Sequence, residues 1–350
     1  SGELKTKPSQ HSVNVLRSYG IQPEILVCRT SYPLPQEEKD KLALFCSVQK
    51  DAVIECRDMK SIYEVPLALE EQNMAAVVLN LLQTCYKRAD LKSWEKLVQR
   101  INNPKKTIDV AIAGKYTKLS DAYISVVESL KHAGYANEAK INIHWINSED
   151  CVDYNKCKEL MKGIKAVVVP GGFGVRGIEG KLNVIRYARE NNVPFLGLCL
   201  GMQCAVIEYA RNVLGLKDAN SHEFSEECEN PVIDLMLEQK EVTAYGGTMR
   251  LGQYECHLKK NSVARKAYGT DIIFERHRHR YEVNNAYVEQ LEKAGLSFSG
   301  KSPNGKLMEI VEIPNLDWFV ASQFHPEFKS RPENPHPLFK GLIDAAVKRK

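Results

Sequence analysis

The feature that most constrains the fold is a cysteine that ends a short apolar run and is followed at once by a helical pattern. Residues 192–203 read NVPFLGLCLGMQ, which places Cys199 between Gly197 and Gly201. A buried strand, a sharp turn and a helix in this order predict a nucleophile elbow with the cysteine at its tip. We expect Gly197 and Gly201 to permit the sharp turn, because glycine has no Cβ atom.

The helix predicted behind Cys199 has consequences for the sulfur. The partial positive charge of a helix N-terminus favours the thiolate over the thiol. The amide N–H of Leu200 would then face an oxyanion that develops beside the sulfur. The motif is short, however, and it equally fits a buried cysteine that merely ends a strand.

Length and composition narrow the class of protein. A chain of 350 residues is long enough for two domains, and 43% hydrophobic with 26% charged residues is ordinary for a globular protein. The net charge of +4, with mixed signs, argues against a nucleic-acid partner. No apolar run reaches the roughly 18 residues of a membrane span, and no zinc-type spacing occurs among the ten cysteines. We expect free thiols, no membrane partner and a cytoplasmic location.

Strand and helix patterns alternate in two blocks. Residues 1–95 contain strand candidates at 25–28 and 52–56 and helices up to about 19, at 36–45 and at 65–85. Two or three strands are few for a domain, so we interpret this block as the C-terminal remnant of a larger α/β domain. Residues 96–106 are polar and contain a proline, and we expect a linker there.

Residues 107–350 form the second predicted domain. Strands are expected at 107–113, 141–146, 165–169 and before Cys199, and helices at 120–133 with Ser120 as N-cap, at 157–161, 180–190 and 337–348. This order predicts the α/β class, with a doubly wound, mostly parallel sheet. The functional site should lie at the carboxyl ends of the strands, where Cys199 falls.

A histidine and a glutamate follow a strand-like run at residues 318–323. In an extended segment, residues two apart point to the same side, so His325 and Glu327 should face together, with the carboxylate orienting the imidazole. A surface His-x-Glu is common by itself. Paired with Cys199, it completes the three parts of an acyl-transfer triad.

Two further motifs could bind anionic groups. The PGGFG turn at residues 170–174 offers the N–H groups of Gly171 or Gly172 as oxyanion donors, each worth on the order of 10²–10³ in rate. The pairs Gly114-Lys115 and Gly180-Lys181 lack the spacing of a phosphate-binding P-loop. RHRHR at 276–280 would place three guanidinium groups on one face of a strand, either as a solvated basic edge or as a clamp for a substrate carboxylate. No residue cluster suggests a catalytic metal.

Together these motifs resemble a known family. PGGFG at 170–174, GLCLG at 197–201 and FHPE at 324–327 are similar to class I glutamine amidotransferases. GELKTKP at 2–8, GVRGIEGK at 174–181, GGTMRLG at 246–252 and ERHRHRYEV at 275–283 resemble the narrower CTP synthase family, which aminates UTP to CTP with glutamine and ATP. The resemblance runs nearly end to end. It implies a class I amidotransferase fold preceded by part of an α/β synthase domain.

The resemblance implies a role for each matching residue of the second domain. Cys199 would attack the glutamine side-chain amide, with His325 as base and acid and Glu327 as its orienter. Glu223 would take the α-ammonium of glutamine, and Arg280 its carboxylate. The implied oxyanion and glutamine-binding set is Gly171, Gly172, Leu200, Gly201, Met202, Gln203, Glu223 and Arg280.

The resemblance also implies nucleotide sites, Mg²⁺ for the full reaction, GTP as activator and a homotetramer. The stretches that serve GTP contain Arg176, Glu179 and Arg250. The UTP/CTP-binding residues would be Lys5, Thr6, Lys7, Pro8, Ser9, Gln10 and Lys41. The residues on the ATP side would be Arg57, Asp58 and Met59.

The sequence departs from the family in two respects. Ser9 stands where threonine is expected and Arg57 where lysine is usual, which keeps the hydroxyl and the charge. The family's N-terminal ATP-binding region, with a glycine-rich loop and magnesium carboxylates, is not found in these 350 residues, so we expect glutaminase activity from this chain alone. Two alternatives stay open: another class I amidotransferase that passes ammonia to a different acceptor, and an inactive interaction module that retains the oligomer interface.

Overall fold

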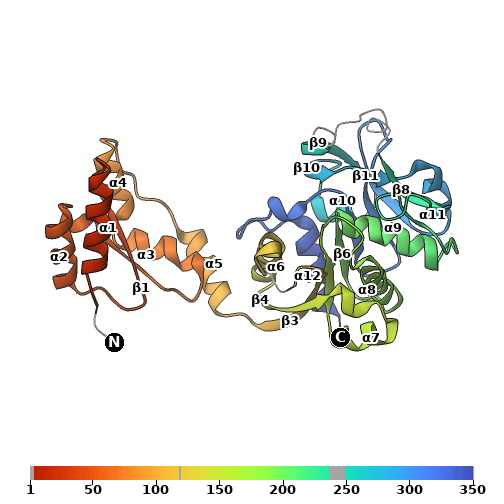
Figure 1. The fold of residues 1–350 in the computed structure, drawn as a ribbon, viewed down its shortest axis with the longest axis horizontal. Coiled ribbons are helices and arrows are strands. Elements are labelled where there is room, and N and C mark those ends of the chain that lie inside the picture. The colour runs from red at the N-terminus through yellow and green to blue at the C-terminus, as the bar shows by residue number, and fades with distance from the viewer. Residues whose placement is uncertain (1–3, 118–119, 236–248, 350) are drawn as a thin grey trace. The chain divides into compact units, whose positions relative to one another are not determined.

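A computed structural model describes residues 4–117, 120–235 and 249–349 (Figure 1). The chain divides into two compact units, Ser1–Asn102 and Asn103–Lys350. In the described part of the chain, no helix is long and apolar enough to span a membrane. All ten cysteines are free thiols, as expected.

The first unit packs helices around one pair of parallel strands. The strands are β1 (Leu26–Thr30) and β2 (Val53–Arg57). The helices are α1 (Lys7–Ser18), α2 (Gln36–Cys46), α3 (Val65–Glu71), α4 (Met74–Leu81) and α5 (Lys92–Asn102), with 3₁₀ turns η1 (Lys50–Ala52) and η2 (Ile62–Glu64). The predicted helices and strands of this block are confirmed. Helix α5 also occupies most of the stretch expected as a linker.

The second unit is built on a nine-stranded sheet with the order β10-β9-β12-β13-β14-β6-β5-β3-β4. Its strands are β3 (Lys106–Gly114), β4 (Ala139–Asn147), β5 (Ala166–Val169), β6 (Phe195–Leu198), β9 (Arg250–Leu258), β10 (Ile272–His279), β12 (Ser297–Lys301), β13 (Met308–Glu312) and β14 (Phe319–Ser322). The segment from β14 to β4 is parallel, and antiparallel pairs extend it from β13 to β10. The predicted α/β class is confirmed.

Helices cover both faces of this sheet (Figure 1). They are α6 (Ile124–Ala136), α7 (Tyr154–Leu160), α8 (Ile178–Glu190), α9 (Leu200–Asn212), α10 (Val263–Tyr268), α11 (Val288–Lys293) and α12 (Pro337–Lys348). A small three-stranded sheet lies beside the large one. Its strands are β7 (Asn220–Ser221), β8 (Pro231–Leu235) and β11 (Tyr281–Val283), and β8 lies between β11 and β7. In β5, Val167 and Val169 enter the core under α8 and α9, whereas Val168 enters the core under α6 and α12. Burial on both faces explains why the central strands read as unbroken apolar runs.

One predicted helix start is wrong. A 3₁₀ turn, η3 (Ser120–Tyr123), precedes α6, and the N-cap of the helix is Tyr123 rather than Ser120. The ring of Tyr123 is buried and stacks on Trp145, with 6.3 Å between the ring centroids. Packing of this ring therefore outweighs the capping preference of serine in setting where the helix begins.

The topology brings three strand ends together. From β3 the chain runs outward to β4, then returns to β5 and β6 on the other side of β3. Gly171 follows β5, Cys199 follows β6 and His325 follows β14, and these three strands are neighbours in the sheet. The carboxyl ends of adjacent parallel strands form the crevice where α/β sheets bind ligands.

We predict that Gly180→Ala destabilises the second unit. A Cβ atom at Gly180 would lie 1.6 Å from the carbonyl oxygen of Ser148, and a clash with backbone is relieved only by moving α8. We expect a cost of about 1–3 kcal/mol or more, measured as a lower thermal midpoint. Arg186→Ala on the same helix is the control, because its ion pair with Glu190 (2.7 Å) is on the surface and worth about 1 kcal/mol at most. Equal midpoints for the two variants would contradict this packing.

Candidate active site

The backbone strain of the elbow falls on the cysteine itself. Cys199 has φ 51° and ψ −102°, a conformation that costs a non-glycine residue about 1–3 kcal/mol. Its N–H donates to the carbonyl of Ser322 (2.7 Å), and its carbonyl accepts from Met202 N (3.0 Å). Hydrogen bonds to β14 and to the first turn of α9 thus hold the strained residue in place.

The flanking glycines permit the sharp turn through their missing Cβ atoms, as expected. Neither Gly197 nor Gly201 has a positive φ angle. A Cβ atom at Gly201 would lie 2.1 Å from the carbonyl oxygen of Val169, and one at Gly197 would lie 2.8 Å from the carbonyl oxygen of Gly201. The two glycines thus allow the chain to turn back closely, with α9 directly against β5 and β6.

His325 and Glu327 do face together, but not in an extended segment. Pro326 begins a 3₁₀ turn, η7 (Pro326–Phe328), because its fixed φ angle suits the first position of a helical turn. The turn brings Nδ1 of His325 to 2.7 Å from Oε1 of Glu327. The expected backbone is therefore wrong, whereas the expected pairing is present.

His325 also lies beside the cysteine. The Cβ position that Gly171 lacks is 3.1 Å from Cε1 of His325 and 3.6 Å from Cβ of Cys199, so a larger residue at 171 would crowd both side chains. Burial lowers the pKa of His325, but its interactions with the Cys199 thiol and the Glu327 carboxylate outweigh burial and raise the pKa to about 10. Within the described residues, Nε2 of His325 is buried without a hydrogen-bond partner. This nitrogen is the one left for exchange of a proton with sulfur or substrate.

A cavity of about 250 Å³ opens next to the sulfur. Its lining consists of Gly172, Phe173, Cys199, Gln203, Glu223, Met249, His279, Arg280 and Tyr281. Cys199 is therefore brought together with four residues predicted to hold glutamine. Phe173, Met249, His279 and Tyr281 were missed by sequence reasoning, although all four stand inside motifs quoted for other residues.

The lining carries opposite charges. Glu223 accepts a hydrogen bond from the N–H of Gly174 (2.8 Å). Burial raises the pKa of the Glu223 carboxyl, while the Gly174 N–H and the cations Lys115, Lys181 and Arg280 act in the opposite direction. A carboxylate and a guanidinium in one small cavity complement a zwitterion.

The glycine-rich turn after β5 is fixed from both sides. Lys115 donates to the carbonyl of Phe173, and Glu223 accepts from Gly174.

Leu200 is the first residue of α9, so its N–H has no carbonyl one turn earlier in the helix to bond. Gly201 and Met202 belong to α9 and do not line the cavity, and Met202 is buried in the core under the sheet.

The three residues expected to serve an activator differ in environment. Arg176 is exposed and lies over the ring of Tyr116, whereas Glu179 pairs with Arg211 (2.9 Å). Arg250 is buried and pairs with Glu309 (2.7 Å). Residues 246–248 of the quoted GGTMRLG stretch lie outside the described residues.

The residues expected to contact nucleotides lie in the first unit. Thr6 is the N-cap of α1, and the next four residues form its first turn. Lys41 pairs with Glu37 and Glu38 on the surface of α2. Arg57 pairs with Glu55 at the end of β2, and Asp58 accepts from the hydroxyl of Ser31 (2.7 Å).

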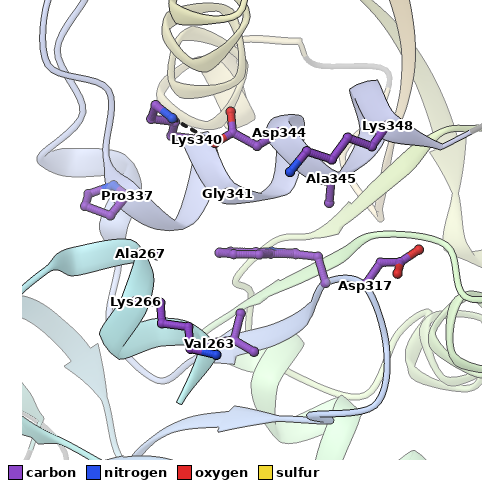
Figure 2. Close-up of a pocket in the computed structure, with 11 residues that line it drawn as sticks. Val263, Lys266, Ala267, Asp317, Pro337, Lys340, Gly341, Asp344, Ala345 and Lys348 are labelled. Atoms are coloured by element: carbon purple, nitrogen blue, oxygen red, sulfur yellow. Dashed lines mark hydrogen bonds and ion pairs between the residues drawn. The ribbon is translucent and has the colours of Figure 1, made fainter. Parts of the chain in front are cut away.

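A larger cavity, of about 640 Å³, lies between α10 and α12 (Figure 2). Figure 2 shows Lys340 paired with Asp344 on α12 (2.7 Å) at its edge. None of the predicted site residues lines this cavity. We therefore locate the candidate site by the chemistry around Cys199 rather than by cavity size.

Comparisons with known proteins show the family to which the chain belongs. Residues 118–345 match the glutamine amidotransferase class-I family, and residues 1–84 match the CTP synthase N-terminus family. CTP synthase of Nostoc punctiforme is 56% identical over 347 residues, which are 99% of this chain and 64% of the relative. CTP synthase of Bacillus subtilis is 53% identical over 347 residues, which are 99% of this chain and 65% of the relative.

A solved structure supports the same relationship. The glutaminase domain of Trypanosoma brucei CTPS, with bound acivicin, has a TM-score of 0.65 and 40% sequence identity, over 69% of this chain and 95% of that one. The fold and the candidate site of the second unit, with the family match, define a class I glutamine amidotransferase. The chain belongs to the CTP synthase family, and it spans about 65% of the length of the curated relatives.

We predict that Glu327→Gln lowers the pKa of His325 from about 10, because it removes one of the two interactions that raise that pKa. A raised histidine pKa stabilises the folded chain below the ordinary imidazole pKa, and this contribution is lost as the pH rises through about 10. NMR titration of labelled histidines measures the shift. His132, whose pKa burial lowers to about 4, is the internal control and should not move. An unchanged His325 titration would contradict the pairing.

Proposed function

We propose that this chain hydrolyses glutamine to glutamate and ammonia, with Cys199 as nucleophile, His325 as acid and base, and Glu327 as orienter of the histidine. The observation that carries the proposal is the 250 Å³ cavity that holds Cys199, Glu223 and Arg280 in one lining. The Trypanosoma brucei relative, a glutaminase domain, supports it at the level of the family.

The proposed reaction has two steps. The Cys199 thiolate attacks the side-chain amide carbon of glutamine, and the C–N bond breaks as His325 gives its proton to the leaving nitrogen, which departs as ammonia. Water, deprotonated by His325, then attacks the thioester and releases glutamate and the thiolate. The N–H groups of Gly171 and Leu200 would stabilise the oxyanion in both steps.

The charges in the cavity would orient the substrate. Glu223 would accept from the α-ammonium of glutamine, and Arg280 would donate to its α-carboxylate. Gln203 lines the cavity and donates to the carbonyl of Tyr281 (3.0 Å), which ties the elbow helix to the wall that carries Arg280. Gly172 and Phe173 would close the opposite side around the side-chain amide.

We further propose the family's whole reaction for the complete protein. Ammonia would aminate UTP to CTP at the expense of ATP, in a cytoplasmic homo-oligomer activated by GTP. Arg176, Glu179 and Arg250 would serve GTP, whereas residues 5–10 and Lys41 would contact UTP or CTP, and residues 57–59 would lie on the ATP side. Among residues 4–117, 120–235 and 249–349, no group of three His, Cys, Asp or Glu side chains could hold a metal ion, so we assign Mg²⁺ to none of them.

The two alternatives are less well supported. A match to the CTP synthase N-terminus over residues 1–84 disfavours an amidotransferase with another acceptor. An interaction module without catalysis would not need a strained cysteine beside a buried histidine–carboxylate pair.

Glutamate release by the intact chain tests the proposal. We predict that Cys199→Ala abolishes glutamine hydrolysis, because the nucleophile is lost, while the circular dichroism spectrum shows an intact fold. Cys204→Ala is the matched control: this buried thiol lies one turn further along α9 and should be dispensable for hydrolysis. Hydrolysis that persists in the Cys199 variant, or a folded wild-type chain that releases no glutamate, would overturn the assignment.

We predict that Arg280→Ala raises the KM for glutamine by about 10- to 100-fold, as expected for the loss of a charged hydrogen bond worth about 1.5–3 kcal/mol. Arg276→Ala is the control, because Arg276 is exposed on β10 and does not line the cavity. Steady-state kinetics of glutamate release measure both variants. A KM that rises equally in the two would indicate a general effect of basic charge instead of a carboxylate contact.

A further inference from the structure

Five buried ionisable side chains form a closed ring behind the candidate glutamine pocket. They are Arg250 on β9, His277 and His279 on β10, Glu282 on β11 and Glu309 on β13, with exposed fractions of 8%, 3%, 2%, 4% and 0%. Burial of so many ionisable groups is costly unless they are paired with one another. The ring therefore calls for an explanation.

Each member contacts the next. Arg250 Nη1 lies 2.7 Å from Glu309 Oε1 and 3.6 Å from Glu282 Oε1. Glu282 Oε1 lies 3.3 Å from His279 Nδ1, and His279 Nε2 lies 2.9 Å from His277 Nδ1. His277 Nε2 lies 3.5 Å from Glu309 Oε2 and closes the ring. No distance between the contacting atoms of consecutive members exceeds 3.6 Å.

The ring holds one wall of the pocket. His279, Arg280 and Tyr281 line the cavity, and Arg280 stands in the bend between β10 and β11. His279 and Glu282 lie on either side of this bend, and both are ring members. Any shift of the ring would therefore move the guanidinium that is proposed to hold the α-carboxylate of the substrate.

We propose that this ring is a positioning device for glutamine, in which Arg250, paired with Glu309 and close to Glu282, fixes the bend that presents Arg280. The inference rests on the proposed function of the pocket. It gives Arg250 a role in addition to the activator role proposed above: the guanidinium contacts Glu309 and Glu282 and lies over the aromatic ring of Tyr254, 4.4 Å from its centroid.

Charge balance favours a single ionised carboxyl group beside Arg250. Burial lowers the pKa of His277 to about 2 and that of His279 to about 3, so neither imidazole contributes positive charge. Two ionised carboxylates and one guanidinium would leave a net negative charge in the interior. Burial raises the pKa of Glu309 to about 7 and that of Glu282 well above its usual range, so the pair loses one proton near pH 7, from Glu309, and keeps the other.

The other titratable groups that face the ring come from two elements. Cys256 and Tyr254 on β9 lie near Glu309 and His277, and His325 after β14 acts on both ring histidines. Burial raises the pKa of Cys256 to a value far above neutrality, and that of His325 is about 10. None of these pKa values falls between 6.5 and 8.5. Ionisation of Glu309 as the pH rises through about 7 should therefore strengthen its ion pair with Arg250, hold the bend in place and tighten glutamine binding.

Calorimetric titration with glutamine at pH 6.5 and 8.5 tests the proposal. All variants are made in the full chain carrying Cys199→Ala, so that binding is measured without turnover. Because this substitution also removes an interaction that raises the pKa of His325, only the part of the pH dependence that Glu309→Gln removes is assigned to the ring. In that background we expect the Kd to fall several-fold at the higher pH. With Glu309→Gln added, the group that titrates near pH 7 is absent, so this fall should disappear.

Arg250→Met is the second variant and should raise the Kd about tenfold or more at both pH values, comparable to the loss of one charged hydrogen bond. Glu275→Gln is the matched control, because Glu275 is buried on β10, the strand of His277 and His279, but pairs with His336 (3.0 Å) outside the ring. It should keep the Kd and its pH dependence. If Glu309→Gln keeps the pH dependence, or if folded Arg250→Met binds like its parent, the ring proposal is wrong. Failure of glutamate release by the wild-type chain would instead overturn the proposed function.

Discussion

The candidate site depends on the backbone of one residue. Cys199 is held at φ 51° where β6 ends and α9 begins, and this conformation is unfavourable for any residue with a Cβ atom. It persists because the neighbouring strand accepts its N–H through Ser322 and because α9 lies directly against β5 and β6. Packing of the core on both faces of the sheet compensates for this unfavourable conformation.

The other parts of the site follow from the order of the strands. Since β5, β6 and β14 are neighbours, the glycine-rich turn, the cysteine and the histidine meet without long loops. A buried imidazole would normally lose its charge. Here the sulfur and the Glu327 carboxylate reverse that effect and raise the pKa of His325 to about 10. The sheet thus supplies both the geometry and the charge partners that keep an imidazolium at neutral pH.

Local sequence patterns were sufficient for the main elements up to the elbow and for their order along the chain, but not for the shorter strands and helices after about residue 221. The apolar runs identified β3, β5 and β6, and the spacing of Gly197, Cys199 and Gly201 identified the elbow. The backbone for which Gly201 makes room could not be read from the sequence, because close approach of α9 to the Val169 carbonyl is a contact between segments about 30 residues apart. The start of α6 was missed for the same reason: the packing of Tyr123 on Trp145 is tertiary.

The alternating RHRHR motif shows where pattern reasoning stops. Alternation correctly separates Arg276 and Arg278, which are exposed, from His277 and His279, which are buried. It cannot show that β10 ends at His279, so that Arg280 turns into the cavity and leaves the row of exposed arginines. Nor can it supply Arg250, Glu282 and Glu309, which come from three other strands. A buried polar group needs partners, and a motif that places two histidines in the core predicts that partners exist without identifying them.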